Sequence, residues 1–329
     1  MKQSLFLIPF LLLFAIGCKG QSNSTMETKT SNPLLCDIES GMCEIPDSAS
    51  VTQKQNVSPK TKSVKVVYFT DPICSSCWGI EPQLRKLKLE YGHSIDIEYR
   101  MGGLLPDWSY NSGGISKPSD VAHHWDEVSL HYDMPIDGDV WLEDPLDSSY
   151  PPSIAFKAAQ LQDQHKAILF LREIREMVFL QKKNIAKWDH LATAAQKVGL
   201  DLNRFQIDYQ GKAKELFQQD LALGKQLGVR GFPTMFFVDG EGHSEKVYGT
   251  KPYSAYETAL HQQLPTVAKS SINTHWKKLF LNYPTMSSRE FSELSGISRN
   301  ETDAYLQKLV DSGQLSKSTS KNGVLWTLK

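Results

Sequence analysis

One stretch, residues 64–92, constrains the fold more than any other part of the chain: "VKVVYFTDPICSSCWGIEPQLRKLKLEYG". It begins with a continuous β-branched and aromatic run, which is typical of a strand covered on both faces. An apolar stripe then recurs at helical spacing up to Gly92, a glycine suited to ending a helix. The stripe consists of Cys77, Ile80, Leu84 and Leu87. The pattern predicts a buried strand that leads directly into a helix, with the CSSC motif at the helix start.

Further strand patterns surround this unit. Residues 95–101, "IDIEYRM", have the pattern of a second strand, so strand, helix and strand form a βαβ unit with a parallel pair. Residues 118–228 contain amphipathic helical segments and no good strand pattern, and strands resume at 234–240 and 244–249. The sequence therefore predicts an α/β domain over residues 64–265 with a large helical insertion at about 118–228.

The CSSC motif places two cysteines where a thiolate is stabilised. The first turn of a helix supplies unpaired backbone N–H groups and the positive end of the helix dipole. We therefore expect Cys74, exposed at this turn, to be the attacking thiol, and Cys77, on the buried stripe, to resolve the mixed disulfide. The alternatives are a structural disulfide and half of a zinc site. We expect no metal, and no cofactor beyond the redox-active Cys74–Cys77 pair.

A second motif, "GVRGFPT" at residues 228–234, places Phe232-Pro233 directly before a predicted strand. Together with CSSC it resembles the thioredoxin superfamily, in which a cis-proline beside the reactive cysteine holds a substrate peptide in extended form. The resemblance implies that role for Pro233 and leaves Phe232 to shape the surface seen by substrate. Trp78, beside Cys77, is the third residue expected to contact substrate, the alternative being that it simply covers the active site.

The resemblance is closer to the DsbA family, which combines a thioredoxin-like fold with a helical insertion. The runs that carry it are "CWGIEPQLRKLKLEYG", "YRMGGLLPDW", "MPIDGDVW", "DPLDSSYPPSIAFKAAQ" and "GVRGFPTMFF". They are similar to a branch that includes FrnE-type oxidoreductases and bacterial protease-adaptor relatives, and the similarity covers residues 64–265. It implies thiol–disulfide exchange. The Ser75-Ser76 dipeptide between the cysteines leaves the direction of exchange open.

The N-terminus carries an apolar segment, residues 1–17, which is too short for a comfortable membrane span and has the form of a secretion signal. The run ends in "FAIGC", which resembles the lipobox of bacterial lipoproteins and implies lipidation of Cys18. We therefore expect a lipoprotein anchored in the cell envelope and facing the periplasm or the extracellular side. An oxidising compartment of this kind permits dithiols to persist as disulfides.

Residues 18–63 are rich in Ser, Thr, Asn, Gln and Lys, and we expect them to form a flexible tether. The tether contains Cys36 and Cys43. Three interpretations stay open for this pair: a second dithiol that exchanges electrons with the CSSC cysteines, a loop-closing disulfide with no catalytic part, or a pair of metal ligands.

The C-terminal residues, 268–329, have a separate pattern of three short helices and a final hairpin, which resembles a winged helix. The local signals are two capping boxes and a hairpin turn: Ser287 with Glu290, Ser298 with Glu301, and Asn322-Gly323. The excess of basic residues here is mild and the whole chain has a net charge of −1, so nucleic-acid binding is not expected. Protein docking or structural capping fits the segment better.

These patterns lead to one main prediction and two alternatives. The chain is expected to be a thiol–disulfide oxidoreductase whose partners are exported protein substrates, a redox partner protein, and a membrane bound through lipid at Cys18. The first alternative is a non-enzymatic adaptor that uses a DsbA-like body to present a client to a protease or an assembly. The second, an isomerase of the glutathione-transferase-kappa kind, is disfavoured because those relatives have Ser in place of the attacking thiol.

Overall fold

The computed structural model describes residues 64–109 and 116–329, together with the backbone of residues 36–37 and 42–44. The predicted signal segment, residues 1–17, and Cys18 lie outside the described residues. None of the helices in the described part of the chain is both long and apolar enough to cross a membrane.

A four-stranded mixed sheet lies at the centre of the molecule, with the strand order β4-β3-β6-β7. The strands are β3 (Val64–Thr70), β4 (Ile95–Met101), β6 (Thr234–Val238) and β7 (Ser244–Tyr248). β3 and β4 run parallel in register from Val64 opposite Ile95, whereas β6 pairs antiparallel with both β3 and β7. The parallel pair predicted from the βαβ pattern is confirmed.

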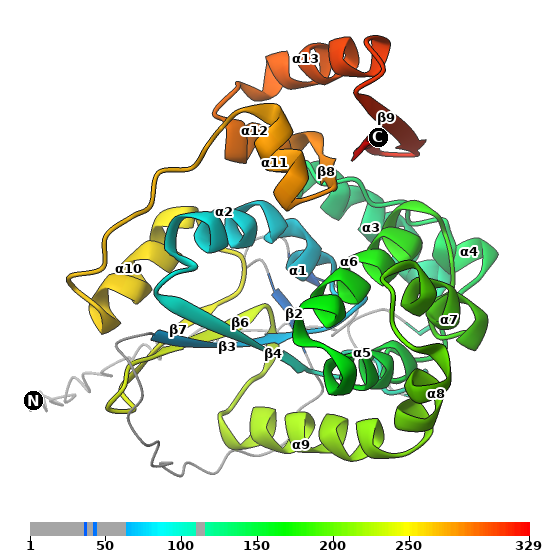
Figure 1. Cartoon of the computed structure of the whole chain (residues 1–329). Helices are drawn as coiled ribbons and strands as arrows, with labels where there is room; N and C mark the ends of the chain where they lie inside the picture. Colours follow the sequence, from blue (N-terminus) through cyan, green and yellow to red (C-terminus); the bar gives the residue numbers. More distant parts are fainter. Residues whose placement is uncertain (1–35, 38–41, 45–63, 110–115) are drawn as a thin grey trace, which may run out of the picture.

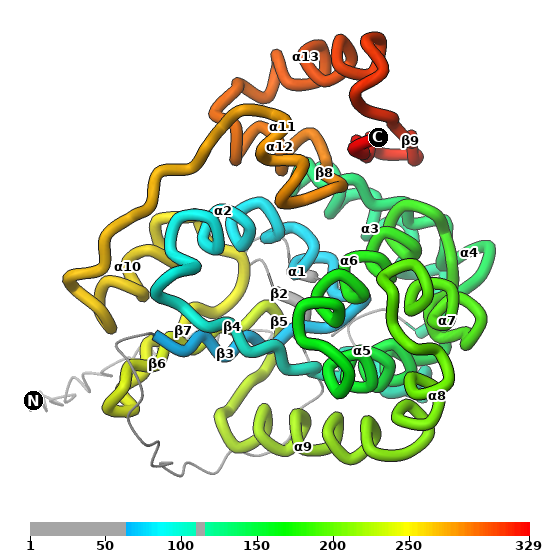
Figure 2. The backbone as a smooth tube through the Cα atoms, viewed as in Figure 1, coloured from blue at the N-terminus to red at the C-terminus, as the bar shows by residue number. Residues whose placement is uncertain are grey.

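Helices cover both faces of this sheet (Figures 1 and 2). α2 (Glu81–Tyr91) and α10 (Tyr253–Gln263) lie on one face, and α9 (Lys212–Gln226) lies on the other. The other inserted helices form a group beside the sheet: α3 (Ser119–Tyr132), α4 (Val140–Glu143), α5 (Tyr150–Gln162), α6 (Gln164–Leu180), α7 (Trp188–Lys197) and α8 (Leu202–Gln210). The predicted α/β class, a thioredoxin-like fold with a helical insertion, is confirmed.

The helix that follows CSSC is divided into two pieces. α1 (Ser75–Gly79) ends before Ile80, and α2 starts at Glu81. The cause is Pro82 in the first turn of α2: it has no N–H, and its ring collides with the carbonyl of Trp78 in a continuous helix. The predicted stripe is nevertheless buried at each of its positions: Cys77, Ile80, Leu84 and Leu87.

The C-terminal residues form a small α+β domain with its own apolar core. Its elements are α11 (Trp276–Asn282), β8 (Thr285–Ser287), α12 (Ser288–Ser295), α13 (Arg299–Asp311), β9 (Leu315–Ser320) and β10 (Gly323–Leu328). Its sheet has the order β8-β10-β9, so helix, strand, helix, helix and hairpin follow one another as in a winged helix. Gly323 pairs with Ser320, which places the hairpin turn at Lys321-Asn322, one residue earlier than predicted. The Asn322 amide in this turn donates to Asp126 on α3 at 2.7 Å.

The two predicted capping boxes differ. Ser287 accepts from the backbone N–H of Glu290, and Glu290 accepts from the backbone N–H of Ser287, which completes the reciprocal pattern. Ser298 makes no side-chain cap. Its hydroxyl instead donates to the Glu301 carboxylate at 2.5 Å, so the second predicted box is wrong.

A buried ion network joins the C-terminal domain to the body. Glu290 on α12 is fully buried and accepts two hydrogen bonds from Arg172 on α6, at 2.8 and 3.0 Å. Arg85 on α2 lies 3.2 Å from the same carboxylate and also donates to the carbonyl of Thr285 at 2.8 Å. The domain therefore contacts both the helix that follows CSSC and the helical insertion.

Candidate functional site

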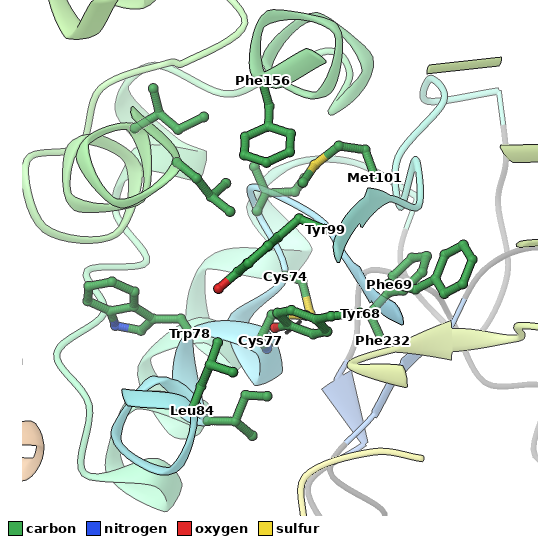
Figure 3. Packing of buried hydrophobic residues seen from close by; sticks show 14 of the residues in the cluster. Tyr68, Phe69, Cys74, Cys77, Trp78, Leu84, Tyr99, Met101, Phe156 and Phe232 are labelled. Atoms are coloured by element: carbon green, nitrogen blue, oxygen red, sulfur yellow. Dashed lines mark hydrogen bonds between the residues drawn. The ribbon is translucent and has the colours of Figure 1, made fainter. Parts of the chain in front are cut away.

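Cys74 and Cys77 lie at the start of α1, where β3 ends (Figure 3). Cys74 is the N-cap residue, and its sulfur accepts a hydrogen bond of 3.1 Å from the backbone N–H of Cys77. Both residues are thiols and both are fully buried. The predicted exposure of Cys74 is therefore wrong in this arrangement.

The N-terminal segment lies close to the CSSC helix. β1 (Cys36–Asp37) and β2 (Met42–Glu44) form an antiparallel pair, and β2 pairs in turn with β5 (Gly231–Phe232). β2 also lies close to α1, within 8 Å between Cα atoms. The residues of the predicted tether that the structure describes thus form a small sheet against the CSSC helix.

The second predicted motif lies at the same place. The peptide bond between Phe232 and Pro233 is cis, and β5 leads through Pro233 into β6. Phe232 is fully buried rather than presented to the surface. Its ring packs directly over Gly102, where an added Cβ would lie only 1.7 Å from Cζ. Pro233 directly precedes Thr234, which pairs with Phe69 near the end of β3 that leads into CSSC, and the Phe232 ring packs in the interior.

Trp78 is also fully buried. Its indole N–H donates to the carbonyl of Pro135 at 3.0 Å, and its ring stacks on Phe179 with centroids 5.4 Å apart. The Arg172 guanidinium lies over the ring at 4.3 Å. Trp78 therefore connects α1 to the helical insertion, and its ring is not at a surface that a substrate can reach.

Sequence reasoning missed Arg175 on α6, a buried charged residue beside the CSSC loop. It is 1% exposed, and it donates to Thr70 Oγ1 at 2.6 Å, to the Asp71 carbonyl at 3.2 Å and to Glu81 at 2.7 Å. The sequence signal is weak, because Arg175 lies in the helical run "AILFLREIREMVFL", which also contains Arg172, Glu173 and Glu176. An arginine buried among β3, the CSSC loop and α2 places a fixed positive charge beside the thiols.

Burial and this charge act in opposite directions on the two thiols. Burial raises the pKa of the Cys74 thiol well above its ordinary value. Burial also disfavours a thiolate at Cys77, but the hydrogen bond from the Cys74 thiol, Arg175 and Thr70 outweigh it and lower the pKa of Cys77. Arg175 therefore favours a thiolate at the CSSC site.

Asp71 immediately precedes the CSSC loop and is fully buried. Its carboxylate accepts from the backbone N–H groups of Ile73 at 3.1 Å and Leu104 at 2.8 Å, and from the Ser149 hydroxyl at 3.0 Å. Burial raises the pKa of Asp71 to about 6 despite these hydrogen bonds. The carboxylate fixes the loop that carries Cys74, so its role is structural positioning.

Only one cluster among the described side chains has the spacing of metal ligands. Asp239, Glu241 and His243 have ligand atoms within 4.8 Å of one another. They occupy the turn between β6 and β7. This turn lies at the end of the sheet where Val238 pairs with Lys65, near the start of β3, whereas Cys74 follows the other end of β3. His243 already contacts Asp239 at 2.9 Å, and two of the three residues are exposed. This exposed turn gives no reason to assign a metal.

The fold and the CxxC site define a thioredoxin-like protein with an appended C-terminal domain. A family model described as thioredoxin matches residues 68–258. The structure of a protein from Nitrosomonas europaea assigned as a disulfide isomerase superposes with a TM-score of 0.52, at 23% identity, and covers 62% of this chain and 97% of that chain. At this identity the likeness supports the fold alone.

Two relatives extend the similarity beyond the thioredoxin-like body. A protein of Halalkalibacterium halodurans named ClpXP adapter protein SpxH is 36% identical over 303 residues, covering 90% of this chain and 97% of the relative. The protein with the same name from Bacillus subtilis is 30% identical, covering 80% of this chain and 89% of the relative. The chain therefore belongs to the thioredoxin family and, within it, to the family of these SpxH proteins. The predicted relationship to thioredoxin-like proteins and to protease adaptors is confirmed.

These relatives correct one prediction. We expected exported proteins and a membrane, bound through lipid at Cys18, as partners, whereas the relatives are named as adapters of ClpXP. The expectation was wrong because it rested on the N-terminal apolar segment. A short apolar segment carries no information about the surfaces with which the folded body binds its partners.

Proposed function

We propose that this chain is an adapter that presents a client protein to a ClpXP-type protease. The observation that carries the proposal is the extent of similarity to the adapter from Halalkalibacterium halodurans, which covers 90% of this chain and 97% of the relative. The thioredoxin match ends at residue 258. The similarity therefore includes the C-terminal domain, which a simple thioredoxin-like enzyme does not need.

The contacts between the two domains support the same proposal. Glu290 is fully buried against Arg172 and Arg85, and Lys86 on α2 contacts Glu293 on α12 at 2.9 Å. A C-terminal domain held against the body through the buried Glu290 network gives an adapter a second surface in a fixed position relative to the first.

Capture and reconstitution test the adapter proposal. A proteolytically inactive ClpP that retains bound proteins is expressed in cells with and without this chain, and the retained proteins are compared by mass spectrometry. We expect at least one protein to be retained only when the chain is present, and the purified chain to accelerate its degradation by active ClpXP. Retention that is identical with and without the chain, and no acceleration by the purified protein, would contradict the proposal.

A second function, dithiol–disulfide exchange, is favoured by one specific observation. Cys74 and Cys77 begin a helix at the end of β3, where Phe69 pairs with Thr234 directly after Pro233, and Arg175 supplies a buried positive charge next to the thiols. This arrangement can stabilise a thiolate and hold a peptide by its backbone. We propose that Cys74 attacks and Cys77 resolves, and that Pro233 lies beside the peptide.

The two functions are separated by cysteine variants. Reduced protein is mixed with a fluorescent peptide that contains one disulfide, and peptide reduction is followed in the wild type, Cys74→Ser and Cys77→Ser. We expect Cys74→Ser to abolish exchange and Cys77→Ser to accumulate a mixed disulfide with the peptide. Exchange that persists in Cys74→Ser would contradict the assignment of Cys74 as the attacking thiol. Degradation of a client by ClpXP in the presence of the Cys74→Ser variant shows independently whether the adapter role needs the thiols.

A further inference from the structure

The N-terminal strand β2 occupies the backbone edge where an extended substrate peptide is expected. β2 pairs antiparallel with β5, with Cys43 opposite Phe232 and Glu44 opposite Gly231. Within the described strands, β5 pairs with β2 and with none of the strands of the central sheet. The edge at Gly231–Phe232 is therefore one to which a separate strand adds, which is how many proteins bind extended peptides.

The register also places the two N-terminal cysteines together. Cys36 and Cys43 are directly opposite each other in the antiparallel pair of β1 and β2. Opposite residues in antiparallel strands have Cα atoms about 4.5–5.5 Å apart, and a disulfide spans about 4.4–6.8 Å. The backbone thus has the geometry that a Cys36–Cys43 disulfide requires.

The same small sheet lies at the CSSC helix. β2 lies within 8 Å of α1 between Cα atoms, and Cys74 is the N-cap residue of α1. Cys74 is fully buried, although the first turn of a helix at the end of a strand is ordinarily open to solvent. These observations place the strand that carries Cys43 close to the start of the CSSC helix and on the β5 edge to which a separate strand adds.

We propose that Cys36 and Cys43 form a second redox pair that the chain binds as its own substrate at β5 and that exchanges its disulfide with Cys74–Cys77. The inference rests on the exchange activity proposed above and adds an intramolecular substrate to it. A passive loop-closing disulfide explains the pairing of Cys36 with Cys43. It gives no reason for Cys43 to lie opposite Phe232 beside the CSSC helix.

The exchange is balanced without any other reagent. Both CSSC cysteines start as thiols; Cys74 loses its proton and attacks the sulfur of Cys43, which forms a Cys43–Cys74 bond and releases Cys36 as a thiolate. Cys77 then attacks the sulfur of Cys74, forms the Cys74–Cys77 disulfide and releases Cys43 as a thiolate. The second pair gains two electrons from the CSSC pair, and the two protons lost at CSSC pass to Cys36 and Cys43.

Trapping the intermediate in the full-length chain tests this proposal. The double variant Cys36→Ser/Cys77→Ser retains Cys43 and Cys74 and can form only one bond between the two sites. It is incubated with graded glutathione disulfide, alkylated, digested with trypsin and analysed by peptide mass under non-reducing conditions. We expect a Cys43–Cys74 linked peptide from monomeric protein, with a yield that is independent of protein concentration.

Two matched variants control for chance proximity. Cys43→Ser/Cys77→Ser keeps Cys36 instead, and Cys36 lies one strand further from β5, so its link to Cys74 should form in much lower yield. Glu44→Pro, added to the trapping variant, disrupts the central strand of the small sheet but keeps the cysteines. It should reduce the Cys43–Cys74 link several-fold and, in the wild-type cysteine background, make Cys74 react faster with iodoacetamide because β2 no longer covers it.

The outcomes separate this inference from the function on which it rests. A mixed disulfide between Cys77→Ser and an external peptide, without a Cys43–Cys74 link in the trapping variant, would overturn the inference and leave the exchange function in place. Equal yields from Cys36 and Cys43 would also overturn it. The absence of both mixed disulfides would remove the exchange function itself.

Discussion

Replacing Glu290 by Gln should destabilise the folded chain by about 3 kcal/mol. The Glu290 carboxylate is fully buried, with Arg172 at 2.8 and 3.0 Å and Arg85 at 3.2 Å. Burial alone raises the pKa of Glu290, but the two arginines outweigh it and lower that pKa, so the group is charged at neutral pH. Breaking a buried ion network from one side costs about 3–5 kcal/mol, because the remaining charges stay buried. The low end applies because Arg172 retains Glu176 at 2.6 Å and Arg85 lies 3.8 Å from Glu81.

The variant isolates the charge, and the same helix offers a control. Gln at this position still accepts the backbone N–H of Ser287, as in a capping box. Glu293 is also on α12 and contacts Lys86, but the two side chains are 19% and 24% exposed. An ion pair that water reaches contributes about 1 kcal/mol or less. Glu293→Gln should therefore leave the free energy of unfolding nearly unchanged.

Urea unfolding followed by tryptophan fluorescence at pH 7 measures both variants. A difference between Glu290→Gln and Glu293→Gln of less than about 1 kcal/mol would refute the reasoning that the network is desolvated. A double-mutant cycle with Arg172→Met adds a second test. The combined loss should be smaller than the sum of the single losses by at least about 1 kcal/mol, since both substitutions remove the same contact. Additive losses would show that the two residues are not coupled.

Three further predictions follow from the site. Gly102→Ala places a Cβ 1.7 Å from Phe232 Cζ, so urea unfolding should show a loss of about 1–3 kcal/mol; an unchanged midpoint would contradict the packing. Burial raises the pKa of Asp71 from 3.8 to about 6, so its contribution to stability is present below pH 3.8 and is lost as the pH rises through about 6. That loss is about 3 kcal/mol, and the difference in unfolding free energy between the wild type and Asp71→Asn, measured from pH 3.5 to 7, should change by this amount. Arg175→Gln removes the buried cation that lowers the pKa of Cys77, so iodoacetamide alkylation of that thiol should shift to higher pH, and an unshifted profile would contradict the assignment.

The sequence predicted the parts of the fold that depend on local pattern. The β-branched run of β3 and the alternation in β4 gave both strands with their observed ends, Val64–Thr70 and Ile95–Met101. The Ser287 and Glu290 capping box was also predicted, because a capping box is specified by residues three apart. In each case the information lies within one turn or one strand of the chain.

The site was predicted only in part, because its environment depends on contacts between distant segments. The position of Cys74 at a helix start followed from the sequence, but its burial did not, because burial is set by segments distant in the chain; β2, for example, lies within 8 Å of α1 between Cα atoms. Arg175 lies about a hundred residues after CSSC, and its distance from the thiols is set by the packing of α6 on the body. Periodicity predicts the face on which a residue lies, but it gives no information on the distant segment that the face contacts.

The shared carboxylate of Glu290 has a consequence for the evolution of the family. A mutation at Arg172 or Arg85 in the body, or at Glu290 in the C-terminal domain, removes one charge from a buried network that the two domains share. The two domains therefore cannot diverge independently at these positions, and neither can be exchanged for an unrelated module without replacing both sides of the network together. Sequences of this family should change the two arginines and the acid as a group, and a lineage that lost the C-terminal domain should have lost both arginines with it.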